Sequence, residues 1–246
     1  MSDDNSMSDD NSTHKDTVHN VITSQTSNII IQQCYPSHTN SDTCVKNDVL
    51  LDTYCVITGP NASGKTTYLK TTAINIILSQ QFGLGFYDKC VMQPYHHIHS
   101  YLNIPDTSAR DSLFQAESRR CKMILDTIKK YSTQRHFCIF DELYSGTNPN
   151  EATKSAFAFL QYLRHYKNVD LFLTTHYVSI CDKFDSEQKE ETIRKVKNYC
   201  MNVDTSDNLP RFTYKIQNGI SNVEGAINIL TEMEYPEEIL YIVGNK

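Results

Sequence analysis

Residues 55–69 read CVITGPNASGKTTYL, and this stretch decides the fold. Its centre, Gly59–Thr66, fits the pattern G-x-x-x-x-G-K-[ST]. The apolar residues before Gly59 predict a strand, and the run after Lys65 predicts a helix. A glycine-rich turn between a strand and a helix lets backbone N–H groups surround phosphate oxygens at the positive end of the helix. Because the chain has only 8 glycines, a chance match is improbable, and we predict a phosphate-binding loop.

The loop residues have separate predicted roles. Lys65 is expected to reach the β- and γ-phosphates of a nucleotide, and the Thr66 hydroxyl is expected to bind Mg²⁺. The cofactors predicted are therefore ATP and Mg²⁺. The nucleotide-binding residues that we predict here are Gly59, Pro60, Asn61, Ala62, Ser63, Gly64, Lys65, Thr66 and Thr67.

Two further apolar runs end in polar side chains. Phe137–Glu142 (FCIFDE) predicts a buried strand followed by two acids, and ligands in α/β folds lie at the carboxyl ends of strands. We predict that Asp141 holds Mg²⁺ and that Glu142 polarises the attacking water. The alternative is a strand followed by solvated charges. Leu171–His176 (LFLTTH) predicts another such strand, and His176 either contacts the γ-phosphate or has a structural role.

Outward from the loop, strands alternate with helices, which predicts an α/β P-loop fold with a mainly parallel central sheet flanked by helices. The predicted strands are 28–33, 50–58, 136–140, 169–175 and 211–217. The predicted helices run from the phosphate loop to Gly83, over about 112–130 and 151–166, and briefly after Asn222. Residues 36–47 are expected to be a loop, and residues 182–210, which are charged and poor in apolar residues, a loop or an exposed helix.

Composition sets the organisation of the 246 residues. The net charge is −6, and most of it lies in the first twenty residues, which repeat MSDDNS. We predict a disordered acidic tail over 1–27 and one domain over 28–246. No apolar run approaches the roughly 20 residues of a membrane helix. The 8 scattered cysteines predict free thiols in an intracellular, reducing compartment.

Taken together, the motifs resemble the ATPase domain of the MutS family of DNA mismatch-repair proteins, a branch of the ABC ATPases. The matching segments, in the order of the family, are TGPNASGKTTYL (58–69), DSLFQAE (111–117), FDELYSGTNPNEA (140–152), TTHY (174–177) and FTYKIQNGIS (212–221). The resemblance covers about residues 45–242. It implies hydrolysis of ATP to ADP and phosphate in a nucleotide-bridged dimer, formed with a second copy or with a MutS-like homologue.

The resemblance also carries roles to single residues. It gives Glu142 and Lys65 catalytic positions and makes His176 the switch histidine of the family. Ser112 matches a serine that touches the γ-phosphate bound by the opposite subunit, although Ser112 and Gln115 also form a capping-box pattern that needs no partner. Tyr214 matches a ring near the adenine.

Three residues depart from the family pattern. Tyr144 and Ser145 stand where the family has Gly and Arg, and Asp111 stands in place of an Arg before the serine. These changes bear on the efficiency of the shared site more than on nucleotide binding.

The expected partner is DNA in mismatch repair or a related process. Residues 1–45 are too few for a mismatch-reading domain, so we expect DNA contact through the ATPase surface or through a partner protein. Basic clusters at Arg119–Lys122 and Arg194–Lys197 could serve, although such clusters are usually solvated. Two alternatives stay open: an ABC-like ATPase unconnected with DNA, and a non-enzymatic ATP-binding partner of a fuller homologue. His96, His97 and His99 could suggest a metal site, but a strand and loop explain them better.

Overall fold

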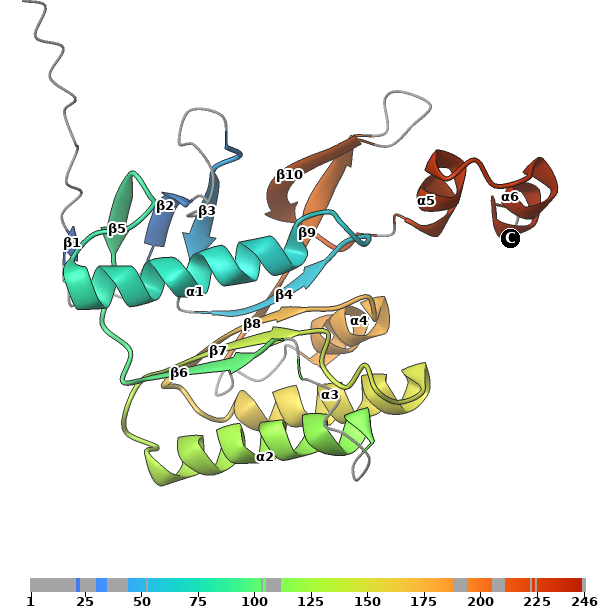
Figure 1. Cartoon of the computed structure of the whole chain (residues 1–246). Helices are drawn as coiled ribbons and strands as arrows, with labels where there is room; N and C mark the ends of the chain where they lie inside the picture. Colours follow the sequence, from blue (N-terminus) through green and yellow to red (C-terminus); the bar gives the residue numbers. More distant parts are fainter. Residues whose placement is uncertain are drawn as a thin grey trace, which may run out of the picture.

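The computed structural model describes residues 21–22, 30–34, 44–51, 53–102, 104, 112–187, 194–204, 211–221, 223 and 225–244. Its centre is a six-stranded sheet with the strand order β10-β9-β4-β8-β7-β6 (Figure 1). The neighbouring strands are parallel, except that β10 runs antiparallel to β9. The predicted fold class, an α/β P-loop domain with a mainly parallel sheet, is confirmed. The strands are β4 (Tyr54–Thr58), β6 (His97–Tyr101), β7 (His136–Asp141), β8 (Val169–Thr174), β9 (Val196–Asp204) and β10 (Arg211–Asn218).

Helices cover both faces of this sheet (Figure 1). Helix α1 (Lys65–Phe82) lies on one face, and α2 (Leu113–Lys130), α3 (Pro149–Leu163) and α4 (Val178–Glu187) lie on the other. Short-range signals set their ends. Gly83 in a left-handed conformation ends α1, and the Asn148 side chain accepts from the Glu151 N–H at the start of α3. Two further helices, α5 (Ala226–Glu232) and α6 (Glu237–Gly244), project from the body of the domain.

The side chains of each strand alternate between two cores. In β4, Tyr54 and Val56 pack with α2, α3 and α4, whereas Cys55 and Ile57 pack under α1. Burial of every residue of β4 explains why the phosphate loop that follows is held on a rigid base. The seven cysteines whose side chains are described are free thiols, as predicted.

A smaller sheet has the strand order β1-β5-β2-β3. It contains β1 (Val21–Ile22), β2 (Ile30–Cys34), β3 (Asn47–Leu50) and β5 (Lys89–Val91). Strand β1 falls within the segment that we predict as a tail, and it pairs with β5; the rest of residues 1–27 lies outside the described residues. The predicted strand over 50–58 is in fact two strands, because β3 belongs to this sheet and β4 to the central one.

The prediction for residues 182–210 is wrong in its second half. Residues 196–204 form β9, which lies between β4 and the edge strand β10 of the central sheet. Its buried residues, Val196, Cys200 and Met201, do not alternate, so the sequence lacks a period of two. Pairing with β4 on one side and β10 on the other imposes the strand instead. No helix within the described ranges is long and apolar enough to cross a bilayer.

Candidate functional site

The predicted phosphate loop joins the end of β4 to the start of α1. Three of its residues have positive φ: Gly59 (153°), Ala62 (62°) and Gly64 (99°). A Cβ on Gly59 would stand 2.9 Å from the Ser63 hydroxyl, and one on Gly64 would stand 3.2 Å from the Tyr214 ring. Backbone conformation and space therefore both require glycine at Gly59 and Gly64.

Lys65 lies inside the loop rather than in solvent. Its ammonium donates to the carbonyl oxygens of Gly59 and Pro60, both at 2.9 Å. Burial lowers the pKa of Lys65, and the carboxylates of Glu142 and Asp141 act against this effect. The loop thus holds a buried cation whose partners are neutral carbonyls, and such a cation favours an anionic ligand.

Asp141 and Thr66 are brought together as a pair, although 75 residues separate them. The Thr66 hydroxyl donates to the two carboxylate oxygens of Asp141, at 3.1 and 2.9 Å. Thr174, at the end of the neighbouring β8, donates to the same carboxylate. A carboxylate and a hydroxyl at this spacing form a donor set that suits Mg²⁺, which prefers oxygen ligands. Thr174 is a site residue that the sequence analysis did not assign a role.

Glu142 and His176 form the second pair. Glu142 Oε1 lies 2.6 Å from His176 Nε2, and both side chains are partly exposed. The hydrogen bond from His176 is the main reason why the pKa of Glu142 is lowered. Glu142 has a φ of 54°, a left-handed backbone that is uncommon outside glycine and recurs at functional sites. Glu142 is therefore a charged carboxylate, oriented by a histidine, at the open edge of the loop.

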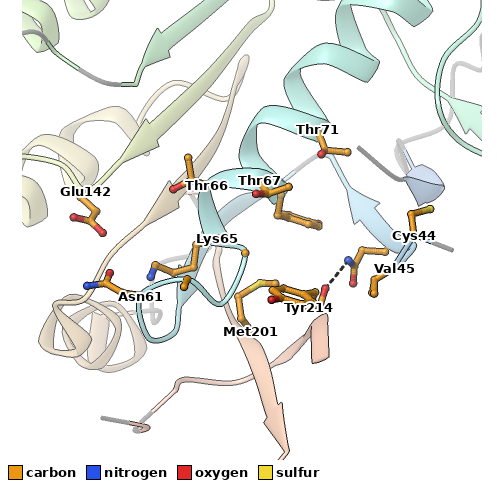
Figure 2. A pocket seen from close by; sticks show the side chains of 14 residues that line it. Cys44, Val45, Asn61, Lys65, Thr66, Thr67, Thr71, Glu142, Met201 and Tyr214 are labelled. Carbon is orange, nitrogen blue, oxygen red and sulfur yellow. Dashed lines mark hydrogen bonds between the residues drawn. The ribbon is translucent and has the colours of Figure 1, made fainter. Parts of the chain in front are cut away.

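A pocket of about 440 Å³ opens over the loop (Figure 2). At one end lie Asn61, Lys65 and Glu142, and at the other lies the Tyr214 ring. The pocket thus joins a polar end that suits phosphates to an end with an aromatic wall. The other lining residues are Cys44, Val45, Asn47, Ala62, Gly64, Thr66, Thr67, Tyr68, Thr71 and Met201.

The residues present fit a triphosphate with Mg²⁺. The Ser63 hydroxyl is buried in the loop and has no hydrogen-bond partner among the described residues. A buried hydroxyl without a partner is costly, and a phosphate oxygen or a bound water is the class of partner that satisfies it. The buried Lys65 ammonium and the Ser63 hydroxyl can donate hydrogen bonds to phosphate oxygens, and the oxygens of Thr66 and Asp141 can coordinate Mg²⁺.

Ser112 is not part of this pocket. It caps α2, which lies on the face of the sheet opposite to α1. The Ser112 hydroxyl accepts from the Gln115 N–H at 3.4 Å, and the Gln115 side-chain oxygen accepts from the Ser112 N–H at 3.0 Å. The capping box is therefore present, and Ser112 is exposed. Contact with a second subunit stays a prediction, and Asp111 lies outside the described residues.

The segment after Glu142 is fastened to α2. Buried Glu117 accepts from the Ser145 hydroxyl at 2.9 Å and from the Gly146 N–H at 3.0 Å. Tyr144 is buried with a φ of 62°, and its ring packs against Phe114. The two departures from the family pattern are thus accommodated locally: Ser145 gains a carboxylate partner, and Tyr144 fills the core at the cost of a left-handed backbone.

Two arginines of the basic clusters are tied into the fold, whereas Arg119, Lys122, Lys195 and Lys197 are exposed, so DNA contact through these clusters stays a prediction. Arg120 donates to the Ser100 carbonyl, Lys122 pairs with Asp126, and Arg194 pairs with buried Asp170. Among the histidines, His97 and His99 belong to β6, and no group of side chains suited to a metal is found in the described part of the chain.

Several pocket residues escaped the sequence analysis. Met201 lies on β9, the strand that was missed, and Cys44, Val45 and Asn47 lie at or just before β3. A hydrophobic period of two would have been the signal for β9, but its residues do not provide one. No sequence pattern predicts that β3 lies next to the phosphate loop, because the two segments meet only through the tertiary fold.

A parallel sheet with a phosphate loop between β4 and α1, and with acids at the end of β7, defines the class of P-loop nucleoside-triphosphatase domains. A family model described as MutS domain V matches residues 55–245. The chain therefore belongs to the MutS family, as the motifs led us to expect.

The curated relatives share this region. The chain is 27% identical over 210 residues to the DNA mismatch repair protein MutS of Bacteroides fragilis, with 80% of this chain and 22% of the relative covered. It is 31% identical over 205 residues to the endonuclease MutS2 of Fusobacterium nucleatum, with 78% and 23% covered. It is 29% identical over 203 residues to MutS of Caldicellulosiruptor bescii, with 80% and 22% covered. The chain thus spans less than a quarter of the length of these relatives.

Proposed function

We propose that the chain binds ATP with Mg²⁺ and hydrolyses it to ADP and phosphate. The observation that carries the proposal is the pairing of Thr66 with Asp141 directly below the loop that encloses the Lys65 ammonium. Thr66 begins α1 and Asp141 ends β7, so the fold brings a hydroxyl and a carboxylate together beside the Lys65 ammonium. Magnesium at Thr66 and Asp141 would neutralise charge on the β- and γ-phosphates.

The reaction needs a water held in line with the γ-phosphate. Glu142 would orient that water and accept its proton, since the carboxylate is ionised and stands at the open edge of the pocket. His176 contacts Glu142 through its Nε2, and in the proposed reaction it would turn toward the γ-phosphate once that phosphate is bound. Lys65 would exchange its two carbonyl partners for phosphate oxygens.

Substitution of Lys65 tests nucleotide binding. We expect Lys65→Ala to abolish tight ATP binding, because it removes the only buried cation in the described pocket lining. Titration of a fluorescent ATP analogue measures the affinity, with Lys70→Ala, an exposed lysine on the same helix, as the control. Equal affinity of Lys65→Ala and the unaltered chain would contradict the proposal.

We further infer that ATP draws two chains into a nucleotide-bridged dimer, in which Ser112 of one subunit completes the site of the other. Exposed apolar side chains on α6 support an assembly, since Tyr241 and Ile242 are each 73% exposed. Such a patch in water usually marks a contact surface. The exposed N-terminus of α2 is compatible with this dimer: the capping box engages the Ser112 N–H and one lone pair of its hydroxyl, and the hydroxyl hydrogen would donate to an anion bound by the other subunit.

A mixing experiment tests the shared site. Glu142→Gln and Ser112→Arg each inactivate a homodimer if the sites form between chains. A mixed dimer then holds one doubly altered site and one intact site, and part of the ATPase activity returns. If mixing restores nothing while ATP is still hydrolysed by the unaltered chain, each chain acts alone and the shared site is wrong.

The family and the names of the relatives favour a role in DNA mismatch repair, with DNA reached through the ATPase surface or through a partner protein. ATP turnover measured without DNA, with matched duplex and with mismatched or branched DNA separates this role from the alternatives. Stimulation by DNA supports it. Turnover indifferent to every DNA favours an ATPase unconnected with DNA. Slow turnover that Glu142→Gln does not change favours a non-enzymatic ATP-binding partner.

A further inference from the structure

The aromatic wall of the pocket is built on an irregular piece of β10. Phe212 pairs with Val203 and Ile216 pairs with Met201, so three residues of β10 lie opposite one residue of β9. In the middle of this bulge, Tyr214 has a φ of 57°, a left-handed conformation that is disfavoured for a side chain of its size. Within the bulge, the Thr213 hydroxyl donates to the Asn202 carbonyl oxygen of β9 at 2.9 Å and accepts from the Lys215 N–H at 3.3 Å. The carbonyl of Tyr214 and the N–H of Ile216 are bonded from outside the β9–β10 pair.

Asn47 supplies the missing partner. Its Nδ2 donates to the Tyr214 carbonyl oxygen at 2.9 Å, and its Oδ1 accepts from the Ile216 N–H at 2.8 Å. The side-chain amide thus imitates the edge of a neighbouring strand, with one bond on each side of Lys215. Asn47 is the first residue of β3 in the other sheet, 167 residues from Tyr214 in the chain.

The bulge sets where the Tyr214 ring lies. The ring reaches to 3.2 Å from the point where a Cβ on Gly64 would stand, so it packs on the glycine that precedes α1. Figure 2 shows Tyr214 beside Met201 and next to the loop that carries Lys65. The Tyr214 residue remains 48% exposed, which leaves surface on which a planar group can stack.

We propose that Asn47 is a positioning residue for the nucleobase: it fixes the Tyr214 bulge, and the bulge holds the ring as the wall on which the base lies. This inference rests on the proposed ATP binding and deepens it. Nδ2 and Oδ1 of Asn47 each make one hydrogen bond to β10, and on this basis we assign Asn47 a role through Tyr214 rather than on the base itself. The two hydrogen bonds of this clamp join β3 to β10 and involve no residue of the phosphate loop, so we expect phosphate binding to be affected less than base binding.

The experiment compares two ligands, ATP and inorganic tripolyphosphate, each with Mg²⁺, by titration calorimetry. We expect Asn47→Ala to weaken ATP binding about tenfold, the scale of one base–aromatic contact, and to leave tripolyphosphate binding within twofold. The control is Gln217→Ala, an exposed residue of β10 beyond the bulge, which should change neither affinity. Equal weakening of both ligands by Asn47→Ala, or no change in either, would overturn the inference.

A double-mutant cycle shows whether Asn47 acts through Tyr214. Tyr214→Ala should weaken ATP binding by itself, and adding Asn47→Ala to it should have no further effect. A further tenfold loss would mean that Asn47 acts independently, and the inference would fall. Asn47→Asp keeps the acceptor for Ile216 and loses the donor to Tyr214, so it should give an intermediate loss of ATP affinity even if Asn47→Ala does not fold.

The unaltered chain separates the two proposals. If it binds ATP and tripolyphosphate equally well, the base is not recognised and the inference about Asn47 fails while phosphate binding stands. If it binds neither ligand, the proposed ATP binding fails, and the inference fails with it.

Discussion

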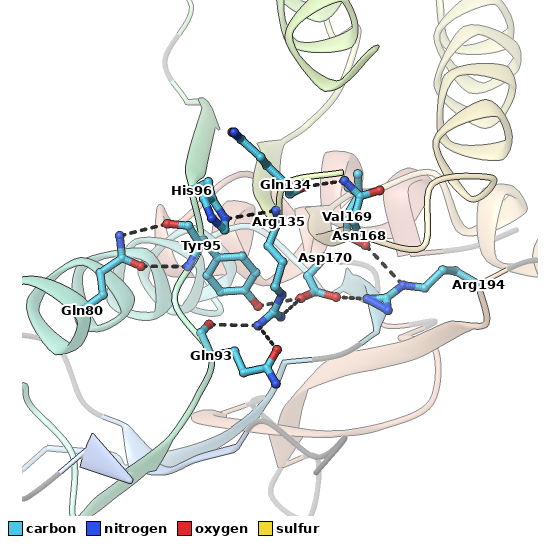
Figure 3. Close-up of polar contacts among 10 residues, drawn as sticks. All are labelled: Gln80, Gln93, Tyr95, His96, Gln134, Arg135, Asn168, Val169, Asp170 and Arg194. Atoms are coloured by element: carbon cyan, nitrogen blue, oxygen red, sulfur yellow. Dashed lines mark hydrogen bonds and ion pairs between the residues drawn. The ribbon is translucent and has the colours of Figure 1, made fainter. Parts of the chain in front are cut away.

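The central sheet has a carboxylate at each end, and the two carboxylates differ in their partners: hydroxyl groups at the carboxyl end and guanidinium groups at the amino end. At the carboxyl end, Asp141 of β7 is partly buried and is held by the hydroxyls of Thr66 and Thr174. At the amino end, Asp170 of the neighbouring β8 is 1% exposed and is paired with Arg135 and Arg194 (Figure 3).

The partners at the amino end close a network. Tyr95 precedes β6, Arg135 precedes β7 and Arg194 precedes β9, so Asp170 ties together the starts of four strands. The Tyr95 hydroxyl donates to Asp170 at 2.7 Å, and burial raises the pKa of Tyr95 so that it keeps its proton. A carboxylate neutralised by two guanidinium groups is structural, whereas one held by neutral hydroxyls keeps its charge for a cation.

The largest expected effect comes from removing the Asp170 charge at the amino end of the sheet. We expect Asp170→Asn to reduce the free energy of unfolding by about 3–5 kcal/mol, because it removes a buried charge and leaves two partly buried guanidinium groups without their counter-charge. Urea denaturation measures the change. The exposed pair Lys122–Asp126 provides the control, since Asp126→Asn should cost less than about 1 kcal/mol. A comparable small change for Asp170→Asn would show that its network does not hold the strands.

The same change of Asp to Asn at the carboxyl end of the sheet should lower ATP turnover rather than stability. We expect Asp141→Asn to keep stability within about 1 kcal/mol, because the amide oxygen can still accept from both hydroxyls, and to abolish turnover that depends on Mg²⁺. Steady-state ATPase assays with varied Mg²⁺, alongside urea denaturation, test both halves. A loss of stability as large as that of Asp170→Asn would erase the contrast between the two ends.

Glu142 lies beside Asp141 at the carboxyl end of the sheet, and its substitution separates proton transfer from nucleotide binding. We expect Glu142→Gln to lower turnover about 10²-fold or more while ATP stays bound, since the amide cannot accept the proton of the attacking water. Single-turnover hydrolysis and nucleotide titration separate the two effects. A parallel loss of ATP affinity would mean that Glu142 belongs to binding rather than to proton transfer.

The smallest expected effect is the pH dependence of a histidine stack at β6 and β7. His99 Nε2 lies 3.0 Å from His136 Nδ1, and burial, together with the neighbouring histidines, lowers the pKa of His99 to about 4. The unfolded chain then binds more protons than the folded one between about pH 6.5 and 4, so stability should fall as the pH drops through this range. His99→Phe should flatten the dependence measured by thermal unfolding. An unchanged slope would assign the acid sensitivity to other groups.

Much of the site follows from short-range signals that the sequence carries. Three features depend on residues within a few positions of each other: the glycines and Lys65 of the loop, the acids at the end of β7 and the cap at Ser112. Backbone conformation and nearby hydrogen bonds therefore set their local structure. The alternation of strands and helices likewise fixed the α/β class, because burial on both faces of a parallel sheet demands continuous apolar runs.

Only the tertiary structure decided how distant segments meet. Residues 196–204 become a strand because they pair with β4 on one side and with β10 on the other, while their apolar residues do not alternate in a way that predicts a strand. The partners of Asp170 and the clamp of Asn47 on Tyr214 join segments between 24 and 167 residues apart. Such contacts depend on strand order and register, which are set by the packing of the whole domain, whereas a loop or a helix cap is stabilised by its own neighbours in the chain.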